Sequence, residues 1–175
     1  MIHLARSDLS GMHCSASFSE CERYRYLLTW RWSADPLLIA WMLNPSTATH
    51  EKLDPTIDGL MKRARAWGHG GVRVINLFAF RATKPADMMK AADPIGPENN
   101  AVTIDVLHEA RHRDEPVICG WGKHGAHRGR AAFAEAIAAG ADVSLRCLAT
   151  NNDGSPRHPL YIAHCIEPQP WAPRA

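Results

Sequence analysis

Seven consecutive apolar residues, Leu37 to Leu43, are the feature of this 175-residue sequence that most constrains its fold. A strand that packs on one face alternates apolar and polar side chains, whereas a strand covered on both faces is apolar throughout. The run has the length of one strand and falls far short of the ~18 apolar residues that a membrane-spanning helix needs. We therefore expect Leu37–Leu43 to be a central strand of a sheet with helices on both faces.

Helical and extended patterns alternate after this run. Asp54 and Pro55 predict the N-cap and first position of a helix that Gly68 ends. Further strands are predicted at 72–78, 116–121 and 143–149, and helices at about 97–111 and 128–139. The alternating residues 24–32 predict a half-buried antiparallel strand before the run. The sequence predicts an α/β fold: a three-layer α/β/α sandwich with a mostly parallel central sheet of about four strands, plus an N-terminal antiparallel strand or hairpin.

The composition is that of one globular domain. Hydrophobic residues make up 46% of the chain and charged residues 22%, which is an ordinary mixture. We expect a single domain over 1–175, with its core at about 18–166 and an irregular tail at 167–175 that contains three prolines. The formal net charge is only +2, so a nucleic-acid partner must be argued from local patches.

The cysteines and the N-terminus favour a cytoplasmic protein. The five cysteines are an odd number and form no C-x-x-C pair, which argues for a reducing compartment. The first residues lack the apolar segment of a signal peptide, and no segment is long enough to span a membrane. We expect a cytoplasmic protein with no membrane partner.

Polar residues at the predicted strand ends are the candidate site, because ligands of open parallel sheets bind beyond the carboxyl ends of the strands. Asn44 follows the apolar run and is held extended by Pro45; its amide could hold a water or a ligand, or only form a turn. Asn76 interrupts an apolar strand, which indicates either a recognition amide or a bond to loop backbone. Asp54 could act as a base, but its position before Pro55 favours capping.

Two later loops carry basic residues. The stretch Lys123–Arg130, which begins within the turn Gly120–Gly125, contains Lys123, Arg128 and Arg130 and no acidic residue. It would suit contacts with phosphate groups, or it could be an ordinary solvated turn. It is not a P-loop, because His124 follows Gly-Lys. In the polar loop 151–161, two prolines bracket Arg157 and His158; this His could donate to a developing anion, or the loop could be an ordinary surface turn.

The segment His108–His112 fits the H-E-x-x-H pattern of zinc proteases. On a helix, however, both histidines fall opposite the apolar face that contains Val106 and Ala110. No third ligand follows. We interpret the match as chance and expect no metal and no cofactor.

Several motifs together are similar to one family of bacterial and phage proteins, known as domain of unknown function 1643. They are Met42–Ala48, Asp54–Thr56, Asn76–Ala79, Arg81–Thr83, Asp93–Asn99, Trp121-Gly and His158–Tyr161. The resemblance extends from about Phe18 to Ile162 and implies no settled activity.

The order of motifs also resembles, more distantly, the uracil-DNA glycosylase superfamily, whose fold is a four-stranded parallel sheet between helices. Leu43-Asn-Pro45 matches its loop after the first strand, Asn76 its strand-end Asn, Gly120–Gly125 its Gly-rich turn, and His158-Pro159 its last loop. Ser46 replaces a bulky aromatic residue, Leu43 replaces a Gly, and Leu160 and Tyr161 replace the Ser-Pro that normally follows His-Pro. Residues 151–156 form an insertion.

The resemblance implies roles for these residues. Asn44 would position the attacking water, Asn76 would read the edge of the base and His158 would stabilise the departing base anion. The catalytic candidates are Asn44, His158 and Asp54. The substrate-binding candidates are Pro45, Ser46, Asn76, Phe78, Trp121, Arg157 and Tyr161. The candidates for contact with a nucleic-acid backbone are Lys123, His124 and Arg128.

Two functions from different classes follow. The first is an N-glycosidic-bond hydrolase that acts on a base in DNA, RNA or a nucleotide without a cofactor. The alternative is a non-catalytic module that binds nucleic acid or a modified nucleotide in the same pocket. The sequence leaves the base, the strand state and the oligomeric state open.

Overall fold

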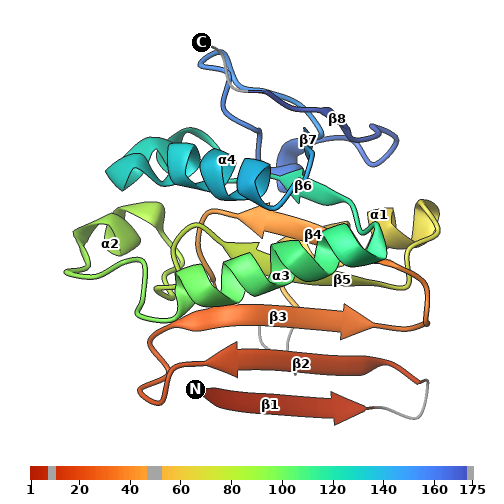
Figure 1. Ribbon diagram of the computed structural model, residues 1–175, viewed down its shortest axis with the longest axis horizontal. Helices are drawn as coiled ribbons and strands as arrows, with labels where there is room; N and C mark the ends of the chain where they lie inside the picture. Colours follow the sequence, from red (N-terminus) through yellow and green to blue (C-terminus); the bar gives the residue numbers. More distant parts are fainter. Residues whose placement is uncertain (8–10, 47–52, 173–175) are drawn as a thin grey trace.

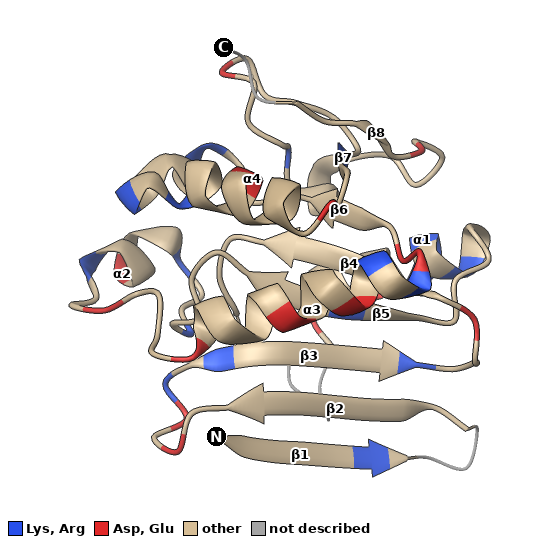
Figure 2. Cartoon of the chain, in the orientation of Figure 1, with Lys and Arg blue, Asp and Glu red and all other residues tan. Residues whose placement is uncertain are grey.

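The apolar run forms β4 (Leu37–Met42), and all six of its residues are buried. The computed structural model describes residues 1–7, 11–46 and 53–172, and within these ranges β4 belongs to a mixed sheet of eight strands. Figure 2 shows that β4 and its neighbour β6 carry no charged residues. The fold is therefore mixed α/β, and β4 lies inside the sheet as the sequence predicts.

The sheet has a parallel part and two antiparallel flanks (Figure 1). Its strands are β1 (Ile2–Ser7), β2 (His13–Phe18), β3 (Arg25–Arg31), β4, β5 (Gly71–Asn76), β6 (Val117–Cys119), β7 (Leu145–Cys147) and β8 (Gln169–Pro170), in the spatial order β1-β2-β3-β5-β4-β6-β7-β8. Strands β5, β4, β6 and β7 are parallel to one another. The hairpin β1–β2 and strand β3 continue the sheet antiparallel on one side, and β8 pairs antiparallel with β7 on the other.

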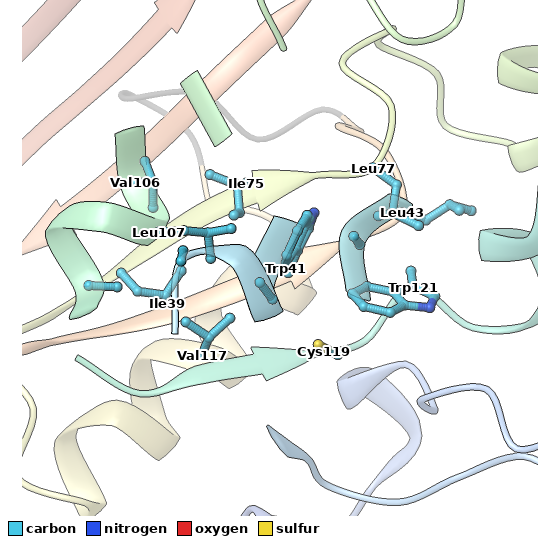
Figure 3. Packing of buried hydrophobic residues seen from close by; sticks show 14 of the residues in the cluster. Ile39, Trp41, Leu43, Ile75, Leu77, Val106, Leu107, Val117, Cys119 and Trp121 are labelled. Carbon is cyan, nitrogen blue, oxygen red and sulfur yellow. The ribbon is translucent and has the colours of Figure 1, made fainter. Parts of the chain in front are cut away.

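In the described part of the chain, four α-helices connect these strands: α1 (Pro55–Ala66), α2 (Pro85–Lys90), α3 (Asn99–Arg113) and α4 (Arg130–Gly140). Alternate residues of β4 contact different helices. Leu37, Ile39 and Trp41 belong to a cluster with α3 and α4, which Figure 3 shows around the Trp41 ring. Leu38, Ala40 and Met42 belong to a second cluster with α1. Helices therefore cover both faces of the parallel part, which explains why β4 has no polar residue.

The structure differs from the sequence prediction at the edges of the sheet. The sheet has more strands and is more mixed than a mostly parallel sheet of about four strands. The prediction of an irregular segment at 167–175 is wrong at Gln169–Pro170, where β8 pairs with Arg146 and Cys147. Cys14 and Ala16 are buried, so the core begins before Phe18. The short helix α2 was not predicted.

The chain order of the parallel strands creates a crevice. After β4 the chain runs through α1 to β5 on one side of β4, and it then crosses through α3 to β6 on the other side. The loops that leave β4 and β6 therefore diverge, and a doubly wound sheet binds its ligands at such a point.

Candidate active site

A cavity of about 1130 Å³ lies where these loops diverge. Residues that follow β4, β5, β6 and β7 line it, together with the first residues of α1. Ligand pockets for small molecules typically occupy roughly 300–1,000 Å³. The cavity is therefore large enough for more than a single base.

Most of the sequence-predicted site residues line this one cavity, although they lie far apart in the chain. They are Asn44, Ser46, Asp54, Asn76, Trp121, Lys123, His124, Arg157, His158 and Tyr161. Residues 47–49 of the first loop lie outside the described residues.

Three predicted residues do not line the cavity. Phe78 is completely buried and packs against the His127 ring, with ring centroids 5.6 Å apart, because the chain turns it into the core after β5. Arg128 is exposed and donates hydrogen bonds to the carbonyl oxygens of Ala91 and Ala92. Pro45 is buried, and its carbonyl oxygen accepts hydrogen bonds from the Asn44 side chain and from the Ala82 backbone N–H. Phe78 and Arg128 are therefore not placed to contact a ligand in this cavity, and Pro45 shapes the loop.

The Asn44 amide holds the first loop in place. Its Nδ2 donates to the carbonyl oxygen of Pro45 at 3.0 Å and to that of Ala82 at 2.7 Å. The second bond reaches a distant segment, so the interaction is more than a local turn. Because both amide hydrogens are engaged, the side chain offers a ligand only its Oδ1 acceptor. An acceptor at this place suits a water molecule that must be oriented.

The Asn76 amide has no partner. Asn76 ends β5 and is 1% exposed, and neither its Oδ1 nor its Nδ2 has a hydrogen-bond partner in the described chain. Its backbone is fixed, because Asn99 Nδ2 donates to the Asn76 carbonyl oxygen at 3.0 Å. An unsatisfied buried polar group costs ~1–3 kcal/mol. The alternative in which loop backbone satisfies this amide is therefore not observed, and a donor and an acceptor remain for a ligand.

Asp54 is the N-cap that the sequence predicts. Its Oδ1 accepts from the Ile57 backbone N–H at 2.9 Å. Its negative charge also acts across the cavity, since it opposes the effect of burial on the pKa of His158. Asp54 therefore contributes both a helix start and an electrostatic influence.

His158 presents a neutral donor to the cavity. Burial lowers its pKa, and the Asp54 charge only partly compensates. Nδ1 accepts from the Leu160 backbone N–H at 3.3 Å, which assigns the hydrogen of the neutral ring to Nε2. A neutral imidazole with its hydrogen on Nε2 can donate to an anion that develops during a reaction.

The rim of the cavity combines cations with exposed hydrophobic side chains. Lys123 and Arg157 are exposed on it. Leu160 is 45% exposed and Tyr161 is 71% exposed. Trp121, by contrast, is 2% exposed and packs edge-on against Trp41 and Trp171, so it builds the wall.

Sequence reasoning missed two arginines. Arg25 at the start of β3 lines the cavity, is 2% exposed, and has a pKa lowered to about 10 because it is buried. Arg63 on α1 is 1% exposed and donates to the carbonyl oxygens of Ile162, Ala163 and His164, which follow the His158 loop. No motif or periodicity indicates either residue.

The zinc interpretation gains no support. His108 and His112 are exposed on the outer face of α3, as predicted. Among residues 1–7, 11–46 and 53–172, no three His, Cys, Asp or Glu side chains are grouped so as to hold a metal ion. In the same ranges, no helix has the length and apolar character needed to cross a membrane.

The structure is that of a mixed α/β protein with a cavity at the carboxyl ends of its parallel strands. Residues 25–160 match the family described as "Protein of unknown function (DUF1643)", and this match covers well over half of the chain. The chain belongs to this family. No curated protein and no solved structure matches the chain.

Proposed function

We propose that the protein hydrolyses the N-glycosidic bond of a base in nucleic acid or in a nucleotide, within a three-layer fold of the uracil-DNA glycosylase type. The observation that carries the proposal is the unpartnered Asn76 amide, which lines the same cavity as Asn44 and His158. An amide that is buried at a cost, at the carboxyl edge of a sheet, is suited to reading the edge of a base.

The chemistry needs few groups. Water adds its oxygen to the sugar carbon, the glycosidic bond breaks with its electron pair on the base, and the proton of the water neutralises the base anion. His158 Nε2–H would donate to the anionic base, which lowers the barrier where charge develops. Asn44 Oδ1 would accept a hydrogen bond from the water and orient it toward a sugar that is already cationic.

The rim supports a nucleic-acid strand as the substrate. Lys123 and Arg157 can contact phosphate groups. The exposed Tyr161 ring can stack on a base, a contact worth ~1–3 kcal/mol per base. A base must leave its stack to reach Asn76, and these contacts would stabilise the strand from which it leaves.

The test is release of free base. The protein is incubated with oligonucleotides that carry uracil, mismatched thymine or modified bases, and with nucleosides, and liberated base is measured by mass spectrometry. Wild-type protein and the exposed-site control His108→Ala should release base, whereas Asn44→Ala and His158→Ala should not. Equal release by all four proteins would contradict the assigned roles.

One observation favours the alternative, a non-catalytic binding module. Both Asn44 hydrogens and one Asp54 oxygen are already engaged within the protein, which leaves these two residues fewer groups for catalysis. A binding module should retain oligonucleotide in a filter assay without any base release. In that case Asn44→Ala would change the dissociation constant alone.

A further inference from the structure

Arg25 reaches the cavity because of an irregularity in the sheet. Ser17 pairs with Leu27 but Phe18 pairs with Arg25, so Tyr26 is an extra residue in β3. Residues directly opposite in an antiparallel pair lie on the same face, and Phe18 belongs to the cluster on the α1 face. The bulge therefore turns Arg25 toward the face that contains Asn76, where strict alternation would have turned it away.

Charged residues of the described chain act on Arg25. Asp54 interacts favourably with the Arg25 guanidinium, whereas Arg81 repels it. Asp54 is also engaged as the N-cap of α1. A guanidinium that lines a cavity favours a ligand atom that carries negative or partial negative charge.

Arg25 and Asn76 differ in the hydrogen-bonding groups that they require of a ligand. The Asn76 amide can both donate and accept, so it can pair with many base edges. A guanidinium has donors only and does not lose its proton near neutral pH. At the 4-position of a pyrimidine or the 6-position of a purine, uracil, hypoxanthine and guanine carry a carbonyl oxygen, whereas cytosine and adenine carry an amino group. An amino group that faces Arg25 would leave two donors opposed in a buried place.

We propose that Arg25 is a specificity-determining residue, which selects a base with a carbonyl oxygen at its buried edge over a base with an amino group. The inference rests on the proposed function, because it takes the ligand of the cavity to be a base. It adds that the bulge at Tyr26 supplies the discrimination and that the uncharged Asn76 supplies the second contact.

Two matched pairs of free bases test this inference without any need for turnover. Hypoxanthine and adenine differ at the 6-position, and uracil and cytosine differ at the 4-position. Affinities are measured by ligand-observed NMR with wild-type protein, Arg25→Met, Arg25→Lys and the exposed control Arg113→Met. Methionine removes the guanidinium donors and keeps a long, unbranched side chain.

The wild type and Arg113→Met should prefer the carbonyl member of at least one pair by about tenfold or more, the discrimination typical of a good base contact. Arg25→Met should lose this preference, and Arg25→Lys should retain part of it. Equal affinities in the wild type, or an amino preference, would overturn the role of Arg25 and leave the proposed function standing. If none of the four bases binds, the base-binding proposal fails and this inference fails with it.

Discussion

The two walls of the cavity are built in different ways. The strand-end wall, which includes Asn44 and Asn76, continues the sheet: the N–H groups of the next residues, Leu77 and Phe78, donate to the Met42 and Leu43 carbonyl oxygens at 2.9 and 3.0 Å. The C-terminal wall, residues 158–166, contains only the three-residue 3-10 helix η2 (Pro159–Tyr161) and is tied to α1 by the Arg63 guanidinium.

Under the proposed function, this difference separates Asn76, which would read the base, from His158, which would stabilise the base anion. The strand-end wall is held by backbone hydrogen bonds to β4 and the residue after it, in addition to the Asn99 side chain. The wall that carries His158 depends on one buried side chain on α1, the helix whose first turn also lines the cavity. A substitution at Arg63 should therefore change the position of His158, although Arg63 does not line the cavity.

The largest effect is expected for Arg63→Met. The variant removes the donor of three part-buried hydrogen bonds from a charged group, and we expect a loss of about 3 kcal/mol in the free energy of unfolding. Urea unfolding measures the loss, and hydrogen exchange should show faster opening at residues 158–166. Lys62→Met, which removes an exposed i,i+4 ion pair on the same helix, should cost much less. Similar losses in the two variants would mean that Arg63 does not hold this wall.

The next effect is expected in the strand-end wall, for Asn99→Leu. Asn99 donates to the carbonyl oxygens of Asn76 and Leu77 at 3.0 and 3.2 Å. We expect a loss of about 2 kcal/mol, mainly from the Asn76 carbonyl oxygen, because Arg130 Nε also donates to the Leu77 carbonyl oxygen at 3.0 Å. Amide exchange at residues 158–166 should stay as in the wild type if the walls are held independently. Parallel loosening of both walls would refute the contrast between them.

A smaller effect with the opposite sign is expected for Asn76→Leu. The wild-type amide is buried without a partner, so an apolar residue of similar size should raise the free energy of unfolding by about 1 kcal/mol. The same variant should lose base binding and base release. If instead it is less stable than the wild type, the amide has a partner that the proposed site does not account for.

The smallest effect is a dependence of stability on pH. Burial lowers the pKa of His158 and of His69 below the value near 6.5 that a histidine has in an unfolded chain. As the pH falls below that value, the unfolded chain binds more protons, so the free energy of unfolding decreases until the folded-state pKa is reached. Urea midpoints at several pH values between about 7.5 and 5 would show a shallower decrease in His158→Gln than in His108→Gln. Equal slopes would remove His158 as a contributor.

Local rules explain which parts of the site could be predicted. Asp54-Pro55 specifies a helix start by capping chemistry alone, and the uninterrupted run Leu37–Leu43 specifies a strand covered on both faces. Asn76 was recognisable as a polar residue where burial was expected. Each of these signals lies within a few residues of the position it describes.

The other residues depend on contacts between distant segments. Arg25 faces the cavity because β2 and β3 pair with a bulge. The alternation of residues within β3 does not reveal this bulge. Arg63 is buried because residues 162–164 lie over α1, 99 to 101 positions later. The position of Phe78 also depends on the course of the chain, because the turn after β5 directs this side chain into the core and away from the cavity.

Three tryptophans in edge-to-face contact give the molecule an internal optical probe. Trp121 lies edge-on to Trp41 and to Trp171, at centroid distances of 5.7 and 5.4 Å, and the Trp171 indole N–H donates to the Gly154 carbonyl oxygen. The electronic transitions of indoles at this distance are coupled. Near-ultraviolet circular dichroism should therefore contain a signal that disappears when Trp171 moves away from Trp121. Ligand entry that shifts the 151–157 loop would then be visible in unlabelled protein, and the titration curve could be recorded from the native chromophores.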